Sequence, residues 1–222
     1  LKYNSSNSSA RYTLRLNGPD YFTFDSLNIR AEGSNYAVGV HLKNSADYNT
    51  FKNCIIECPK VNSSLGWYYN IYNNISAIVM INNSDYQGSY DYYYGSTYVT
   101  DQSGYNGAYN TFDNNQLNGA DNNGVSGPMF GIFESGLANY YSYNGYVQNN
   151  TFNKNKVKNI YACGIASIYA NGPWITHNTI TRDIYWSNTK SGQAMGINSS
   201  FCAPSSRQAL IDGHIVTQFQ CN

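Results

Sequence analysis

The sequence carries little charge and no excess of either sign. Lys and Arg number 13, Asp and Glu number 13, and charged residues make up 12% of the 222-residue chain. A nucleic-acid binder needs a basic surplus to neutralise phosphates, and a polybasic membrane-surface protein needs one to bind anionic lipids. Both classes are therefore disfavoured. A run of 18 or more apolar residues is also missing, so we expect no membrane span.

Strong helix-forming patterns are missing as well. Stretches rich in Ala, Glu or Lys do not occur, and 17 Ile residues outnumber 9 Leu residues. The chain instead holds 33 Asn, 24 Ser, 23 Tyr and 19 Gly. The scarcity of Leu, Ile, Val and Phe borders on a disordered composition, but disorder also requires net charge and few aromatic residues. We therefore predict a folded, all-β chain without long helices.

Catalytic and metal-binding patterns are sparse. The only glutamates are Glu32, Glu57 and Glu134, whereas glycoside hydrolysis needs two carboxylates that flank one bond. Arg182 is the least unsuitable candidate for lyase chemistry, and an ion pair is the more ordinary role for it. His214 stands alone on a strand-like segment and is interpreted as structural. The sequence therefore predicts no catalytic residue, no cofactor and no metal site.

The five cysteines allow two readings. In an oxidising compartment Cys54 and Cys58 could form one disulfide, and Cys202 and Cys221 a second. Alternatively, all five are buried thiols, as we expect for Cys163 in its apolar segment. Zinc is disfavoured because no histidine lies at ligand spacing from a cysteine. The three histidines are His41, His177 and His214.

One short pattern recurs along the chain. Asn-Thr is followed by an apolar residue, a few polar residues and a second apolar residue in four segments, which begin at Asn49, Asn110, Asn150 and Asn178. A weaker copy begins at Phe24. The four starts lie 61, 40 and 28 residues apart, which indicates a short unit that carries insertions of variable length.

A second, more apolar motif alternates with the first. Its copies span residues 37–42, 77–81, 129–133, 163–168 and 194–197. Strands this short cannot bury an apolar face alone, but coils stacked at roughly 4.8 Å build one continuous core. Asn suits the corners because it tolerates left-handed backbone geometry. We predict about nine coils of about 25 residues each. Asn-Gly pairs, among them those that begin at Asn106, Asn118, Asn123, Asn144 and Asn171, leave a β-sandwich of hairpins open as the alternative.

Residues 12–29, followed by Tyr48-Asn-Thr-Phe-Lys-Asn53, resemble right-handed parallel β-helix repeat proteins. More narrowly, they are similar to large secreted surface proteins of Bacteroidota-type bacteria. This resemblance implies a single-stranded right-handed parallel β-helix (solenoid) over residues 12–222 and an extracellular or cell-surface location. It implies little about activity, because the fold hosts enzymes, adhesins and filament proteins alike.

Two Tyr-rich insertions interrupt the repeats, at residues 86–109 and 136–146. Tyr offers a large contact area with few rotatable bonds and a polar tip, as binding loops require. We therefore expect binding or assembly loops here, although tyrosines that simply cover the outside of the stack remain the alternative. The candidate residues are Tyr90, Tyr92, Tyr93, Tyr94, Tyr140, Tyr141 and Tyr143.

The chain contains several glycosylation candidates. Asn-x-Ser/Thr sequons occur at Asn4, Asn7, Asn62, Asn74, Asn82, Asn149 and Asn198. Some matches arise by chance in a chain so rich in Asn, Ser and Thr. The resemblance implies a different acceptor, Ser26, for O-linked glycans. The sequence does not choose between the two chemistries.

The ends of the chain bear on assembly. The sequence begins at Leu1 without a Met or a signal-like apolar core, so we expect a processed chain or an excerpt. Residues 1–11 read as a flexible, polar segment that could add a strand to a neighbouring molecule. Contacts of this kind do not close and therefore produce filaments.

We thus expect a non-catalytic, glycosylated extracellular structural protein that self-assembles head to tail into a surface filament or forms part of a large adhesin. The alternative is a polysaccharide-binding or lyase-like polysaccharide-degrading module.

Overall fold

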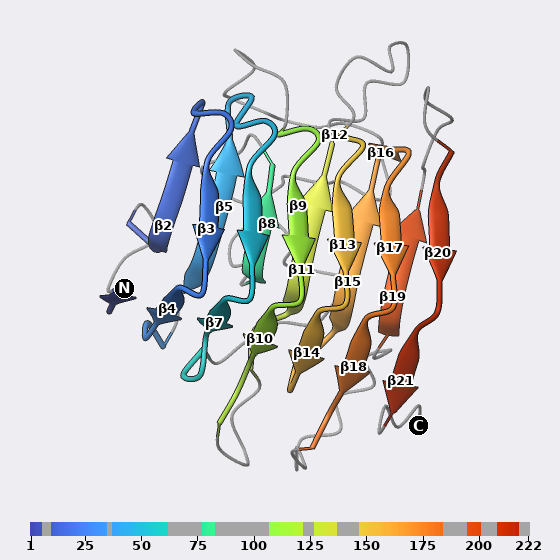
Figure 1. Cartoon of the computed structure of the whole chain (residues 1–222). Coiled ribbons are helices and arrows are strands. Elements are labelled where there is room, and N and C mark those ends of the chain that lie inside the picture. The colour runs from blue at the N-terminus through green and yellow to red at the C-terminus, as the bar shows by residue number, and fades with distance from the viewer. Residues whose placement is uncertain are drawn as a thin grey trace, which may run out of the picture.

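The computed structural model describes residues 1–5, 10–34, 37–61, 77–82, 107–121, 127–136, 147–183, 195–200 and 208–217. Within these ranges the regular structure is entirely β-strand, and no helix occurs. The strands form several parallel sheets that run side by side (Figure 1). The all-β prediction is therefore confirmed.

Three long parallel sheets make up the stack. Sheet A has seven strands, β1 (Lys2–Tyr3), β4 (Asn28–Ala31), β7 (Ile55–Glu57), β10 (Gln116–Asn118), β14 (Lys156–Lys158), β18 (Thr179–Thr181) and β21 (Ile215–Thr217). Sheet B has six, β2 (Tyr12–Asn17), β5 (Val38–Lys43), β8 (Ala77–Ile81), β11 (Phe130–Ser135), β15 (Cys163–Ile168) and β19 (Met195–Ser200). Sheet C has six, β3 (Thr23–Asp25), β6 (Thr50–Lys52), β9 (Thr111–Asp113), β13 (Thr151–Asn153), β17 (Trp174–Thr176) and β20 (Leu210–Asp212). A small fourth sheet pairs β12 (Val147–Gln148) with β16 (Ala170–Asn171).

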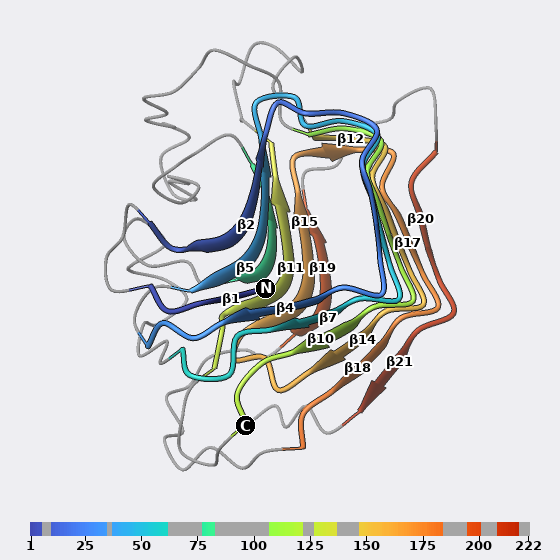
Figure 2. The same ribbon diagram turned by 60° about the vertical axis from the view of Figure 1, so that its left-hand side comes forward.

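The chain visits the sheets in the fixed order B, C, A and then begins the next coil. The described residues complete six coils in this way, and β1 precedes the first. Figure 2 shows the three sheets as three sides around one interior. Because every strand pairs in parallel with the equivalent strand of the next coil, the architecture is consistent with a β-helix or solenoid.

The prediction of nine coils of about 25 residues was wrong. Equivalent positions of sheet C are Thr23, Thr50, Thr111, Thr151, Trp174 and Leu210. Their spacing varies widely, because the chain inserts segments of different lengths between strands that nonetheless keep their register. A uniform coil length therefore overestimates the number of coils.

Short strands build the core because each contributes one inward side chain. In β6, β9 and β13 the central Phe is fully buried, and the Phe51 and Phe112 rings stack with centroids 4.8 Å apart. Successive side chains of a strand point to opposite faces, so the flanking residues of each triplet face outward. The Asn-Thr-Phe pattern thus marks sheet C, and the weaker copy at Phe24 pairs in register with Phe51, as predicted.

The apolar motif forms sheet B, whose strands are buried on both faces. In β5, β8 and β11 every residue is buried. Side chains of one face join the main core, and those of the other form a second apolar cluster around Met80 and Phe133. A glycine recurs in four of the six strands, at Gly39, Gly131, Gly164 and Gly196. A Cβ at Gly164 would lie only 2.6 Å from Ile180 of sheet A, so these glycines let the two sheets approach closely.

Buried Asn side chains link the coils at the corners. Asn155 shows the arrangement: its Oδ1 accepts the Asn115 backbone N–H at 3.1 Å, and its Nδ2 donates to the Phe112 carbonyl at 2.9 Å. Such bonds satisfy backbone groups that the turning chain leaves without a ladder partner. One column comprises Asn49, Asn110 and Asn150, and the other comprises Asn115, Asn155 and Asn178.

The alignment of the fourth repeat needs correction. Asn178 does not precede a sheet C strand as Asn150 does; it precedes β18 of sheet A and occupies the position of Asn155. The true equivalent of the Asn-Thr-Phe strand in that coil is β17, with Ile175 in place of Phe. Both corners combine a buried Asn with a three-residue strand, so the same sequence pattern is compatible with a strand of sheet C or of sheet A.

His214 continues the second column at its far end. Its Nδ1 accepts the Asn178 backbone N–H at 3.2 Å, and its Nε2 lies 2.9 Å from the Ile175 carbonyl oxygen, to which it donates in this tautomer. The imidazole thus reproduces both bonds of an Asn. The structural role predicted for His214 is confirmed.

Candidate functional site

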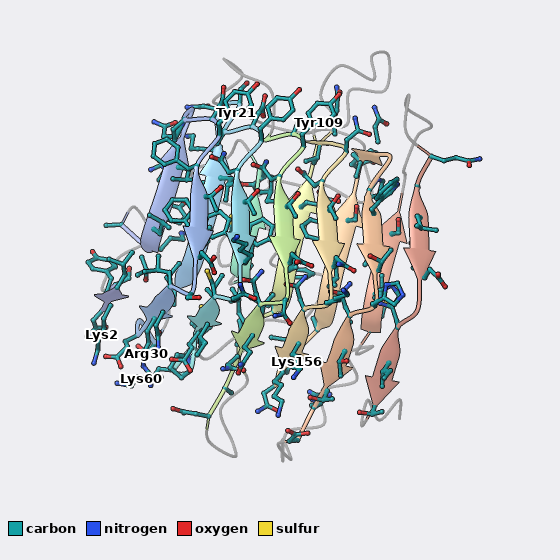
Figure 3. The ribbon with its side chains drawn as sticks, viewed as in Figure 1. Lys2, Tyr21, Arg30, Lys60, Tyr109 and Lys156 are labelled. Carbon is teal, nitrogen blue, oxygen red and sulfur yellow. The ribbon has the colours of Figure 1, made fainter. Side chains whose placement is uncertain are left out.

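Exposed aromatic side chains gather along one edge of sheet C. Tyr21, Tyr48 and Tyr109 come from three successive coils and each lies two residues before a sheet C strand. Their ring centroids are 4.9 and 4.8 Å apart, and the rings deviate from parallel by 8° and 1°. Figure 3 labels the two outer members of this row, which we call the tyrosine ladder. The ladder is the most regular exposed aromatic feature of the described residues.

The corner backbone sets the direction of these rings. All three tyrosines have left-handed φ angles, of 62°, 56° and 56°, which a bulky residue rarely adopts. The next two coils place Asn149 and Gly172 at this corner, the residue types that suit such geometry best. Because the rings stack along the axis, solvent meets their edges. Tyr21 is the exception, since it is first in the row and 74% exposed.

The environment of the ladder favours the neutral phenol. Partial desolvation raises the pKa of Tyr48, and the neighbouring Tyr109 and Tyr21 and the carboxylate of Asp47 raise it further. Desolvation likewise raises the pKa of Asp47, whose carboxylate accepts the Ala108 backbone N–H at 2.7 Å. At neutral pH the central residue of the ladder, Tyr48, therefore presents an uncharged phenol.

The outer face of sheet C adds two polar columns next to the ladder. The first column is Thr23, Thr50, Thr111 and Thr151. In the second, Asn153 donates to Asp113 at 2.8 Å and accepts from the Thr176 hydroxyl at 2.8 Å. Lys52 pairs with Asp25 at 3.2 Å in the same column. These groups bond mainly to one another along the axis, which stabilises the stack.

A charged cluster surrounds Arg30 on sheet A (Figure 3). Arg30 lies 3.0 Å from Glu32 and 2.9 Å from Glu57, and Lys2 lies 3.0 Å from Glu32. The hydrogen bond from Arg30, followed by that from Lys2, lowers the pKa of Glu32. A carboxyl held deprotonated in this way is a poor general acid at neutral pH. The two glutamates therefore tie the first coils together through Arg30.

The third glutamate lies inside the stack. Glu134 is buried in sheet B, accepts hydrogen bonds from Ser167 and from Asn150 Nδ2 at 2.9 Å, and takes a column position that Leu42 and Ile81 fill in earlier coils. It lies too far inside the core to reach a substrate. The described part of the chain also has no group of three His, Cys, Asp or Glu side chains suited to a metal ion.

His41 is the most strongly perturbed histidine. Complete burial, with a smaller contribution from Arg15, lowers its pKa to about 3. Its ring stacks on Tyr12, with centroids 4.4 Å apart, and its Nε2 lies 3.1 Å from both the carbonyl and the side-chain oxygen of Asn82. A histidine that stays neutral and buried serves packing here.

The sequons differ in accessibility. Asn4 is exposed, and Ser26 is exposed at a left-handed corner, where its hydroxyl donates to Asp25 at 3.0 Å. Asn82 and Asn149 are buried, and a bulky glycan has no room at either side chain in the folded chain. Asn198 is partly buried. Asn7, Asn62 and Asn74 lie outside the described residues.

The Cys54–Cys58 disulfide, one of the two readings that the sequence allows, is not formed. Both thiols are free and buried, as is Cys163, and burial raises the pKa of Cys58 to about 12. The two cysteines flank the extended strand β7, and four residues of extended chain span about 13 Å, well beyond disulfide reach. Cys202 and Cys221 lie outside the described residues.

The structure describes only some of the residues that we expect to mediate assembly. The seven tyrosines predicted in the two insertions all lie outside the described residues. The N-terminal segment is not simply a flexible tail, because Lys2 and Tyr3 form β1 and pair in register with Arg30 and Ala31 of the same chain. The tyrosine ladder was not predicted, although Tyr-x-Thr-Phe occurs three times and could have revealed it.

The last coil exposes residues that are buried in every interior coil. Ile211 continues the Phe column of sheet C and is 48% exposed, and Val216 continues the central column of sheet A and is 44% exposed. At the opposite end Leu1, which precedes β1, is 59% exposed. Both ends of the described stack thus present apolar side chains and unpaired strand edges.

Neither the family models, nor the curated proteins, nor the solved structures include a match to this chain. Among the described residues no helix is long and apolar enough to cross a membrane.

Proposed function

We propose that this chain is a non-catalytic structural protein, a right-handed single-stranded β-helix whose copies associate head to tail at the cell surface or outside the cell. The observation that carries the proposal is the exposure of Val216 in the last described coil, whose equivalents in the interior coils are fully buried. Covering such a surface with another coil removes apolar area from water and satisfies free backbone groups. A second copy of the same stack supplies the parallel strand β1 for the free edge of β21.

The contact is assigned to sheet A. Among the described strands, β1 pairs only with β4 and β21 only with β18, so each has a free edge. The register places Leu1 opposite Ile29 and hence in the same column as Val216. Pairing β21 of one copy with β1 of the next therefore sets two exposed apolar side chains against each other.

Direct continuation of all three sheets is less favourable. Sheet A has one strand more than sheets B and C. If sheets B and C of one copy continued directly into those of the next copy, β1 of the next copy would have to occupy the place of β21 of the first. It would also set Asp212 beside Asp25 in the outer column of sheet C. Hydrogen bonds, the largest from Asn53, lower the pKa of Asp25 and favour its charged form, and two acidic side chains directly opposite each other are unfavourable.

Sedimentation velocity on the 222-residue chain and three variants tests the contact. We expect concentration-dependent association of the parent chain and its loss in Val216→Asp and after deletion of residues 1–3. The matched control is Ile215→Asp, which adds the same charge to the neighbouring, outward-facing position of β21 and should still associate. A parent that stays monomeric would contradict the proposal, and stronger association after the deletion would show that the contact uses all three sheets.

Surface glycosylation belongs to the same proposal. Asn4 and Ser26 are exposed acceptors, and glycans there would coat the outside without entering the core. Intact-mass analysis of the protein from its natural source, before and after removal of N-linked glycans, distinguishes the two linkages. A measured mass equal to that of the unmodified chain would refute the proposal that the surface is glycosylated.

A polysaccharide-binding module is the second candidate. It is favoured by the exposed aromatic residues along the edge of sheet C, which are Tyr21, Phe22, Tyr48, Tyr109 and Trp174. Sugars stack on ring faces, however, and within the ladder only the outer faces of Tyr21 and Tyr109 are not stacked on another tyrosine. Binding of soluble polysaccharides by affinity electrophoresis, with Tyr21→Ala as the test variant and Tyr3→Ala as the control, decides the matter. Retardation that only Tyr21→Ala abolishes would favour this candidate.

A further inference from the structure

The tyrosine ladder combines three properties that a covalent cross-linking site requires. Tyr21, Tyr48 and Tyr109 are 74%, 43% and 40% exposed, so a protein oxidant can reach them. Their rings are nearly parallel, with neighbouring centroids 4.9 and 4.8 Å apart. They come from successive coils, and the register that pairs Thr23 with Thr50 and Thr50 with Thr111 holds them in place.

We propose that the tyrosine ladder is an oxidative cross-linking site, at which a haem peroxidase with hydrogen peroxide couples Tyr48 to Tyr21 as dityrosine. The reaction needs two phenols held together, and the stack supplies them at a far higher effective concentration than free diffusion would. The rings must still move closer to bond, and exposed side chains change rotamer within nanoseconds.

The chemistry balances with peroxide as the oxidant. Each of two phenols gives up its hydroxyl hydrogen, as one electron and one proton, and becomes a phenoxyl radical. The two radicals couple through a new carbon–carbon bond between ring carbons ortho to the oxygens. The hydrogen on each of these carbons then leaves as a proton and each oxygen regains one, which restores both aromatic rings. The two electrons and two protons removed overall reduce one hydrogen peroxide to two waters.

The cross-link would hold the first coil, at the end of the stack, to the second coil. Tyr21 belongs to the first coil, whose outer side has no neighbouring coil among the described strands apart from β1. Joining Tyr21 to Tyr48 closes a loop between two coils and removes conformational freedom from the unfolded chain, as a disulfide does. This role is independent of head-to-tail association, because both tyrosines belong to one molecule.

The sequence permits an unambiguous test. Trypsin releases Tyr21 in peptide 16–30 and Tyr48 in peptide 44–52, and each peptide contains a single tyrosine. The folded 222-residue protein is treated with horseradish peroxidase and hydrogen peroxide, digested and examined by mass spectrometry. We expect a product that joins these two peptides with the loss of two hydrogens, together with dityrosine fluorescence. Its yield should fall sharply when the protein is oxidised in denaturant.

Variants and isotope labelling separate the alternatives. Tyr48→Phe keeps a stacking ring but cannot form a phenoxyl radical, so the joined peptide should be lost, whereas Tyr3→Phe, an exposed tyrosine outside the ladder, should leave its yield unchanged. Oxidation of an equal mixture of light and heavy protein should give joined peptides without mixed labels. Absence of the product from folded protein, an equal yield in denaturant, or mixed labels would each overturn the proposal. Head-to-tail association could fail in sedimentation without affecting any of these results.

Discussion

Removal of one buried Asn side chain should weaken the stack far more than removal of an exposed one. Asn155 is fully buried, and its Oδ1 accepts both the backbone N–H and the side-chain Nδ2 of Asn115, at 3.1 and 3.0 Å. Its Nδ2 donates to the Phe112 carbonyl and to Asn178 Oδ1, at 2.9 and 3.0 Å. Asn155→Ala leaves the Asn115 N–H and the Phe112 carbonyl without this partner and out of reach of water.

The expected magnitude follows from the groups left without a partner. An unsatisfied buried polar group costs about 1–3 kcal/mol, so two such groups cost about 2–6 kcal/mol. The matched control is Asn153→Ala, two residues away on the outer face. Asn153 bonds to Asp113 and Thr176 at the surface, where water can replace it, and the expected cost is below about 1.5 kcal/mol.

Urea unfolding followed by circular dichroism measures both costs. The slope of each transition must match that of the parent chain, because repeat stacks can lose coils separately and a changed slope would signal this. Equal costs for the two variants, or a cost below about 1 kcal/mol for Asn155→Ala, would refute the reasoning that the buried Asn column holds the coils together.

Three further outcomes are expected. His214→Asn should unfold at the same urea concentration as the parent, because Asn can accept from Asn178 as the imidazole does, whereas His214→Leu should unfold earlier; equal midpoints for both would contradict this role. Gly164→Ala should cost about 1–3 kcal/mol in the same assay, since its Cβ would lie 2.7 Å from a backbone oxygen of the next coil, and a neutral effect would show that the sheets can separate freely. The lowered pKa of Glu32 means that its ion pairs stabilise docking of β1 above the ordinary glutamate pKa and are lost as the pH falls through the lowered value. The Arg30 and Glu32 amides, which donate to the Leu1 and Tyr3 carbonyls at 2.8 Å, should therefore lose protection from exchange as the pH falls below the ordinary glutamate pKa, and pH-independent protection would contradict the assignment.

The parallel stack could be predicted because its signal is repeated. Each triplet such as Thr50-Phe51-Lys52 contributes one inward side chain. One such triplet is a weak signal, but its repetition along the chain predicts stacked parallel strands. The apolar motif was equally readable, since strands buried on both faces lack polar alternation. The number of coils was not predictable, because backbone pairing is indifferent to the length of chain inserted between coils.

Other features depend on three-dimensional geometry that the amino-acid sequence alone does not distinguish. Asn150 and Asn178 look alike in sequence, yet they occupy different corners, because each corner needs the same side-chain bonds to backbone groups. The burial of Asn82 follows from its contact with His41, which lies 41 residues away in sequence. The tyrosine ladder was missed since stacking requires the register between coils, and Tyr109 was therefore read as part of an insertion.

The central claim, that stacks of this kind join end to end, is tested most directly by negative-stain electron microscopy of the purified chain at two concentrations. The account predicts filaments one stack wide, which lengthen at the higher concentration and are absent from the Val216→Asp variant. Discrete short rods at both concentrations, or filaments that persist in Val216→Asp, would contradict it.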